Sequence, residues 1–176
     1  GSFSDSGQSL GTSDSIGIEL GDLDADGDLD AFVANHGNQA NKVWINDGNG
    51  AFSDGGQSLG SSTSMSAALG DVDGDGDLDS FTANVGQANK AWVNDGNGSF
   101  SDSGNSLGDS GSDDVVLGDF DGDGDLDAFV ANNSPANRVW LNRVTASGFE
   151  IATAAPNANG TDVDLSIDTA SGRTYE

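Results

Sequence analysis

Apolar and polar residues alternate along this chain in short segments, and the same pattern of segments occurs three times. Each pattern starts with a short apolar stretch that leads into an acidic loop. A second stretch leaves the loop, and a third, centred on a Trp, follows it. We predict strands at the three kinds of stretch: SIGIELG (15–21), SMSAALG (64–70) and DDVVLGD (113–119); DAFVAN (30–35), DSFTAN (79–84) and DAFVAN (127–132); NKVWIN (41–46), NKAWVN (89–94) and NRVWLN (137–142).

A hairpin signal follows the third strand of the first two patterns. The sequence NDGNG begins at Asn46 and at Asn94 and contains Asp-Gly and Asn-Gly, the residue pairs typical of tight turns between antiparallel strands. A fourth, weaker strand is predicted to begin at Phe52 and at Phe100. No segment shows a convincing helical period of 3.6 residues, so the chain is predicted to be all-β.

The spacing of aromatic residues and aspartates defines the repeat. Phe3, Phe52 and Phe100 each precede the first Asp of an acidic loop by 19 residues, which gives a unit of 48 or 49 residues. We therefore divide the chain into repeats at about 1–49, 50–97 and 98–143, followed by a C-terminal extension, 144–176.

Four short antiparallel strands in under about 50 residues match the size of one propeller blade. The predicted fold is thus three four-stranded propeller-type blades plus a C-terminal β-strand tail. Closed propellers have about four to eight blades, so three blades leave two exposed sheet faces and unpaired edges. The chain also opens on a fourth-strand sequence, which must join either its own last blade or a neighbour's. A six-bladed ring of two copies and an open fibre both remain possible.

The acidic loops carry the candidate chemistry. In Asp22-x-Asp24-x-Asp26-Gly27-Asp28-x-Asp30, carboxylates at positions 1, 3, 5 and 9 can converge on one ion, and Gly at position 6 permits a sharp turn. Position 7 is expected to offer its backbone carbonyl and to point its side chain outward. An all-oxygen shell favours Ca²⁺ over Mg²⁺, and Zn²⁺ prefers nitrogen or sulfur ligands. We therefore predict three calcium sites with candidate residues Asp22, Asp24, Asp26, Asp28, Asp30, Asp71, Asp73, Asp75, Asp77, Asp79, Asp119, Asp121, Asp123, Asp125 and Asp127.

The stretch ALGDVDGDGDLDSFTANVGQANKAWVNDGNGSF (68–100) and its two counterparts resemble FG-GAP or VCBS repeats, which are similar to the calcium-binding blades of integrin α-subunit heads. The resemblance covers about residues 1–143. It implies four-stranded blades with calcium in the loop between the first two strands, held by the aspartates at loop positions 1, 3, 5 and 9. The chain departs from complete heads of this type in having three blades where they have about seven.

Composition narrows the choice of partners. The formal net charge is −25, and the loop aspartates account for 15 of the 30 acidic residues. The rest of the chain is still acidic, which argues against nucleic acid or an anionic membrane as a partner. With no cysteine there is no disulfide or thiolate site. No apolar run reaches the roughly 18 residues that a membrane-spanning helix needs.

These observations predict an extracellular or cell-surface protein, because the low calcium concentration of the cytosol would leave such sites empty. We expect a structural or adhesive module that self-assembles into an oligomer or fibre through blade edges and the C-terminal strand. The alternative is a glycan-binding, lectin-like propeller that uses Trp44, Trp92 and Trp140, although core packing is favoured for these rings. No enzymatic activity is expected, since His36, the only histidine, accompanies no nucleophile signature.

Two further patterns have structural interpretations. Lys42, Lys90 and Arg138 share one register, which predicts pairing with acidic neighbours. In the C-terminal extension, 162–168 alternates apolar and polar residues as a half-buried strand does, and 149–155 is a second, shorter candidate. We expect this tail to pack on the blades or to pair with another subunit; a linker into a further domain is the alternative.

Overall fold

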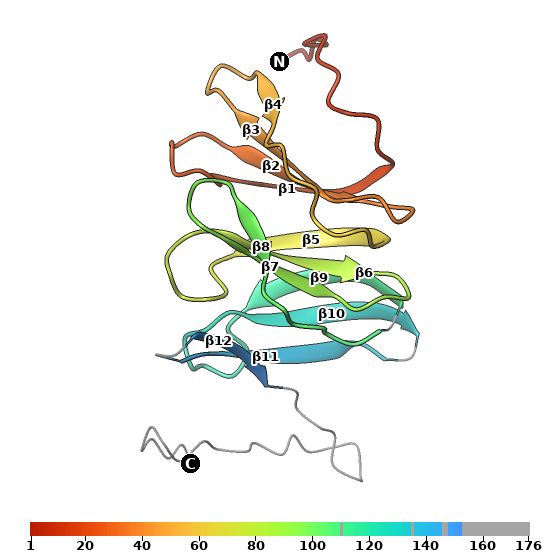
Figure 1. Cartoon of the computed structure of the whole chain (residues 1–176), viewed down its shortest axis with the longest axis vertical. Helices are drawn as coiled ribbons and strands as arrows, with labels where there is room; N and C mark the ends of the chain where they lie inside the picture. The colour runs from red at the N-terminus through yellow and green to blue at the C-terminus, as the bar shows by residue number, and fades with distance from the viewer. Residues whose placement is uncertain (110, 135, 146–147, 153–176) are drawn as a thin grey trace.

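The computed structural model describes residues 1–109, 111–134, 136–145 and 148–152, and within them it contains strands and no helix. The strands form three four-stranded sheets, stacked along the long axis of the molecule (Figure 1). The first sheet contains β1 (Ser15–Gly21), β2 (Asp30–Asn35), β3 (Lys42–Asn46) and β4 (Phe52–Asp54). The second contains β5 (Ser64–Gly70), β6 (Asp79–Asn84), β7 (Lys90–Asn94) and β8 (Phe100–Asp102). The third contains β9 (Gly111–Gly118), β10 (Asp127–Ser134), β11 (Arg138–Thr145) and β12 (Gly148–Ala152).

Neighbouring strands in every sheet are antiparallel and follow chain order, which confirms the predicted all-β repeat. In the first sheet Gly21 pairs with Asp30 and Ala31 with Trp44, and the other two sheets repeat this register. The strands β4 and β8 belong to the beginnings of the second and third sequence repeats. Each sheet therefore takes its fourth strand from beyond the sequence boundary drawn above, and β12 fills that place in the third sheet. The predicted strand at 162–168 lies outside the described residues.

Apolar side chains fill the two spaces between consecutive sheets. The strands β1, β5 and β9, which open the three sheets, lie side by side along the stack. The first interface core, between the first and second sheets, consists of Leu23, Phe32, Ala34, Val43, Leu59, Ala67, Trp92 and Phe100. The second interface core consists of Phe81, Ala83, Ala91, Leu107, Val115, Ala128, Val130 and Trp140. Among the described residues, the middle sheet is thus the only one of the three that is packed on both faces.

The repeated tryptophans are mainly core residues. Trp92 and Trp140 are buried in the two interface cores, whereas Trp44 in the first sheet is half-buried. A β-carbon added to Gly60 would lie 3.1 Å from the ring of Trp92, so the linker between sheets can cross this ring closely only with glycine at that point. The backbone angle φ of Gly60 is +72°, a second reason for glycine there.

The shared register of the basic residues has the predicted structural explanation in two repeats. Lys42 Nζ lies 3.2 Å from an Asp54 carboxylate oxygen, and Lys90 Nζ lies 2.9 Å from Asp102. These ion pairs join the start of the third strand to the end of the fourth. Arg138 occupies the equivalent position in the third sheet and is exposed.

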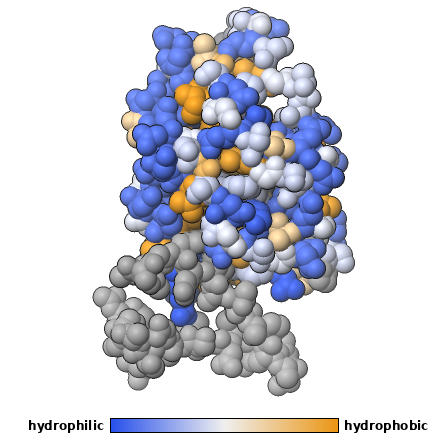
Figure 2. Space-filling view, viewed as in Figure 1, coloured by the Kyte–Doolittle hydropathy of each residue, from blue (hydrophilic) through white to orange (hydrophobic). Residues whose placement is uncertain are grey.

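The two ends of the stack expose apolar side chains, as predicted for an array of three blades. The outer side of the first sheet exposes Ile16, Ile18, Leu20 and Leu29, and the third sheet exposes Val116, Phe120, Phe129 and Val139. Most of the surface seen in Figure 2 is hydrophilic, with apolar residues visible in places along the stack. Phe3, in the opening segment, is also exposed and belongs to no strand. None of the described residues forms a helix long and apolar enough to cross a membrane.

Candidate metal centres

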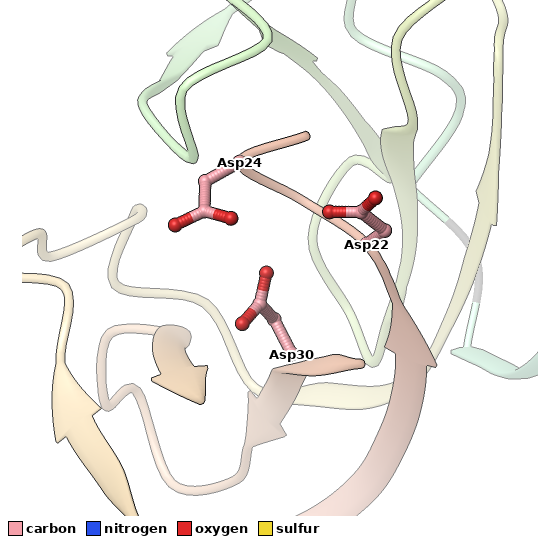
Figure 3. A group of neighbouring side chains, drawn as sticks. All are labelled: Asp22, Asp24 and Asp30. Carbon is pink, nitrogen blue, oxygen red and sulfur yellow. The ribbon is translucent and has the colours of Figure 1, made fainter. Parts of the chain in front are cut away.

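Each acidic loop brings three of its five aspartates together. Asp22 lies just after β1, Asp24 lies in the loop, and Asp30 opens β2; their carboxylates point toward a common space (Figure 3). One carboxylate oxygen from each of these residues lies within 4.8 Å of those of the other two. Loop positions 1, 3 and 9 form the same group in the other repeats: Asp71, Asp73 and Asp79, and Asp119, Asp121 and Asp127.

The aspartate at position 1 shapes the loop. Asp22 Oδ1 accepts a hydrogen bond from the backbone N–H of Asp26, and Oδ2 accepts one from Gly27, both at 3.1 Å. The equivalent Asp71 accepts from Gly74 and Gly76 at 2.7 and 3.1 Å. The loop backbone therefore wraps around this carboxylate, and its N–H groups hold the carboxylate beside the other two members of the group.

The aspartate at position 9 connects three parts of its sheet. Asp30 is fully buried; Oδ2 accepts from the N–H of Leu23 at 2.9 Å, and Oδ1 accepts from the N–H of Asn46 at 2.8 Å. Asp79 and Asp127 make the same pair of bonds. Loop, second strand and third strand are thus joined through one side chain. Each carboxylate oxygen keeps a second lone pair, which can coordinate an ion.

The aspartate at position 3 has the least favourable surroundings. Asp24 Oδ1 is buried and has no hydrogen-bond partner. Burial, followed by the negative charges of Asp30 and Asp26, raises the pKa of Asp24. The pKa values of Asp73 and Asp121 are raised by burial and next by the adjacent position-5 aspartate. A bound cation would provide the missing partner and offset the repulsion, so the residues present fit a metal ion.

The aspartates at positions 5 and 7 lie outside the three-carboxylate group. Asp26 Oδ1 accepts from the N–H of Asp28 at 2.9 Å, within the loop. Asp28 lies against Gly48 in the turn between β3 and β4, and Asp125 Oδ2 accepts from the N–H of Val144 at 2.7 Å. The side chain at position 7 therefore serves the turn or the third strand. The candidate residues that the structure does not bring into a group are Asp26, Asp28, Asp75, Asp77, Asp123 and Asp125.

A repeated asparagine, which the sequence analysis did not identify, connects the first and second loops to the sheet that follows each of them. Asn94 Nδ2 donates to the carbonyl of Leu23 at 2.8 Å, and Asn142 Nδ2 donates to that of Val72 at 2.7 Å. The available signal was an Asn two residues after the Trp in every repeat, at Asn46, Asn94 and Asn142. These two acidic loops are consequently part of the contacts between sheets.

Comparison with known families agrees with this repeat architecture. A sequence model described as "FG-GAP-like repeat" matches residues 22–82 and 71–130. Each match starts at the first aspartate of one acidic loop and ends in the second strand of the next repeat. A search of curated proteins found no match to the chain.

We expect Ala25→Gly to stabilise the protein. Ala25 occupies position 4 of the first loop with φ at +61°, where the other loops have Gly74 and Gly122. A left-handed backbone costs roughly 1–2 kcal/mol for an L-residue, and the extra freedom of glycine in the unfolded chain offsets part of this. The expected gain is about 0.5–1 kcal/mol, measured by urea denaturation.

The control for this substitution is Gly122→Ala. A β-carbon at Gly122 would meet nothing within 4 Å, so the substitution changes the backbone energy without a clash. We expect a loss of about 1 kcal/mol. Destabilisation by Ala25→Gly would contradict the backbone interpretation.

The stability of the metal-free protein should fall as pH rises from about 4 to about 6. Burial raises the pKa of Asp79 from 3.8 to about 6, so the folded state binds this proton more tightly than the unfolded state does. The neutral carboxyl of Asp79 therefore contributes to the free energy of unfolding in full below about pH 4, the pKa of this group in the unfolded chain. This contribution, at most about 3 kcal/mol, is lost as the pH rises through about 6, the pKa in the folded protein. With saturating calcium the slope should reverse, because the ion competes with the proton.

This pH dependence can be assigned by comparison with Asp79→Asn. Denaturation in metal-free buffer across pH 4–7 should show a smaller fall for the variant, since it lacks the titrating carboxyl. Equal slopes for the two proteins would contradict the assignment to Asp79.

Proposed function

The chain belongs to the FG-GAP-like repeat family, and from that premise we propose that it is an extracellular calcium-binding protein with a structural or adhesive role. FG-GAP repeats are typical of extracellular proteins. The observation that carries the calcium proposal is the threefold group of carboxylates, with a buried, unpartnered oxygen on Asp24. Calcium would be held by the aspartates at positions 1, 3 and 9 of each loop.

The donor set favours calcium among common metal ions. The three groups supply only carboxylate oxygens, which suit hard cations, and within the described residues they contain no imidazole or thiolate. Flexible loops with several oxygen donors suit the higher and less regular coordination of Ca²⁺ better than the strict octahedron of Mg²⁺.

Electrostatic repulsion gives the ion a structural role. Two charged carboxylates whose oxygens lie within 4.8 Å of each other repel by roughly 3–4 kcal/mol or more at an effective dielectric constant near 20. Every loop contains three such pairs, and its aspartates also hold the loop to the second and third strands. Calcium would remove the repulsion where these hydrogen bonds meet, and so make each blade rigid.

The affinity expected for such sites fits an extracellular location. With a dissociation constant of about 10⁻⁴ M, as in many extracellular modules, calcium at about 1 mM adds about 1.4 kcal/mol per site. Three sites then add about 4 kcal/mol, close to the whole stability of a small domain. At cytosolic calcium concentrations these sites would be empty.

We also propose that the protein self-assembles and has no enzymatic role. The apolar side chains exposed at both ends of the stack support assembly, because soluble monomers rarely expose contiguous apolar patches of this kind. Blade edges and the C-terminal segment are further candidate contacts. His36 lies 3.6 Å from Asp14 on the surface, away from the three carboxylate groups, and its placement gives no support for catalysis.

Glycan binding is the second candidate function, and one cavity favours it. A cavity of about 210 Å³ beside Trp44 is also lined by Asn35, Lys42 and Asp54, a combination of aromatic and polar groups that suits a sugar ring. Glycan-array binding that is lost in Trp44→Ala would support this function. An array without binding, at saturating calcium, would exclude it for the glycans tested.

Removing calcium should lower the melting temperature substantially. A loss of about 4 kcal/mol in a chain of this size corresponds to roughly 8–16 °C. We expect this shift between millimolar calcium and excess EDTA, measured by differential scanning calorimetry. An unchanged melting temperature would contradict a structural role for calcium.

A matched pair of variants tests whether the loops are responsible. Asp73→Asn removes one proposed ligand and one half-buried charge that the neighbouring aspartates repel, so the metal-free protein should be at least as stable as the wild type. Part of the calcium-dependent gain should be lost. Asp109→Asn removes the same charge from an exposed position outside the loops and should leave that gain intact.

A further inference from the structure

The two ends of the stack expose the two halves of an interface that already occurs twice inside the chain. We define the forward face of a sheet as the face that meets the following sheet, and the backward face as the face that meets the preceding one. Inside the chain, each forward face packs on a backward face in an interface core. The backward face of the first sheet and the forward face of the third have no such partner among the described residues.

The exposed backward face repeats residues that are buried elsewhere. Ile18 on β1 is 61% exposed, whereas its equivalents Ala67 and Val115 are 3% and 4% exposed within the two interface cores. Leu20 and Leu29 are each 57% exposed. Their equivalents in the second sheet are Leu69 and Leu78, which pack against the first interface core.

The exposed forward face shows the same relation. Val139 on β11 is 42% exposed, and its equivalents Val43 and Ala91 are completely buried. Phe129 is 39% exposed, and its equivalents Phe32 and Phe81 lie in the first and second interface cores. The third sheet thus presents the apolar surface on which another backward face packs.

A glycine at the end of each first strand provides the seat for the leucines of the next sheet. A β-carbon on Gly21 would lie 3.1 Å from Leu69 and even closer to Leu78, and Gly70 has the same relation to Leu117 and Leu126. A larger residue at either glycine would force these leucine side chains to shift. Gly118 provides the third seat, and Leu20 and Leu29 are the leucines without one. The ring of Phe120 now lies beside Gly118 and must turn when they enter.

The repeated asparagine also differs between buried and exposed faces. Asn94 Nδ2 donates both to Leu78 O in its own sheet, at 3.1 Å, and to Leu23 O in the preceding sheet. Asn46 Nδ2 donates within its own sheet, to Leu29 O at 3.1 Å. The position equivalent to Leu23 in the third loop is Phe120, so its carbonyl is the matching acceptor on the other exposed face.

We propose that copies of this chain associate head to tail, with the forward face of the third sheet in one copy packed on the backward face of the first sheet in the next. This proposal rests on the self-assembly proposed above and specifies the faces that carry it. The joint continues the interface found between consecutive sheets. It uses sheet faces and not strand exchange, because β12 already occupies the fourth position of the third sheet.

The test uses two variants that each block one face. Ile18→Asp charges the backward face, and Val139→Asp charges the forward face; both side chains are exposed in the isolated chain, so folding should be retained. Ser106→Asp adds the same charge to an exposed position in the linker between the second and third sheets and serves as the control.

Sedimentation velocity in millimolar calcium should show dimers or larger species for the wild type and for Ser106→Asp. Each blocked variant alone should be monomeric, with association weakened at least about tenfold by the buried, unpaired charge. A mixture of the two variants should form a dimer and nothing larger, because one forward face and one backward face remain intact. A monomeric wild type, or a mixture that stays monomeric while the wild type assembles, would overturn the proposal.

Cysteine cross-linking gives an independent readout in a chain that has no cysteine of its own. The Ser66 hydroxyl donates to Asp114 Oδ1 at 2.7 Å across the second interface, so Ser66→Cys with Asp114→Cys should cross-link within one chain. Gly17 is the equivalent of Ser66 in the first sheet. Gly17→Cys with Asp114→Cys should therefore cross-link between chains. A β-carbon at Gly17 would lie 3.0 Å from Met65 O, so folding of this variant is checked first by its melting transition. A folded variant that forms only unlinked monomer would overturn the proposal.

The outcome is separable from the calcium proposal. The melting temperature of Val139→Asp should still rise with calcium, because all three carboxylate groups are intact in this variant. Loss of assembly with a retained calcium shift identifies the face as the cause, whereas loss of the calcium shift in the wild type counts against the proposed function itself.

Discussion

A buried carboxylate at the end of each acidic loop holds its sheet together. The Asp30 side chain is fully buried, and its two oxygens accept hydrogen bonds from Leu23 at the start of the loop and Asn46 at the end of β3. A buried charge is costly unless hydrogen bonds and an opposite charge compensate it. The N–H groups of Leu23 and Asn46 provide the hydrogen bonds, but the neighbouring carboxylates of Asp22 and Asp24 add further negative charge instead of an opposite charge. A cation in that space would resolve the conflict, which is why we propose that calcium is part of the fold.

The loop is also where each sheet contacts the next. Leu23 donates its N–H to Asp30, accepts from Asn94 of the second sheet through its carbonyl, and packs its side chain in the first interface core. Order in the acidic loop and packing between sheets therefore depend on the same residue. For the third loop, the equivalent residue is Phe120, which lies on an exposed face. Calcium in that loop would then order the surface that we expect another copy to meet.

The sequence predicted the repeat, the strands and the acidic loops because alternation and spacing depend on local chemistry alone. It did not predict that Asp28 and Asp125 would face a turn and the third strand, since the direction of a loop side chain depends on partners distant in sequence. The role of Asn94 was missed for the same reason: its acceptor, Leu23, is 71 residues away. The fourth strands begin at Phe52 and Phe100, as predicted. Which sheet each of them joins depends on pairing in space, so repeats counted from the spacing of Phe and Trp end before the last strand of each sheet.

The most direct test of calcium as part of this fold is to count the ions that the protein binds. Isothermal titration calorimetry of the metal-free chain should show that each chain binds three calcium ions, with dissociation constants of about 10⁻⁴ M. Magnesium should bind much more weakly. Binding that is absent at millimolar calcium, or that is equally strong for both ions, would contradict the assignment of the three carboxylate groups as calcium sites.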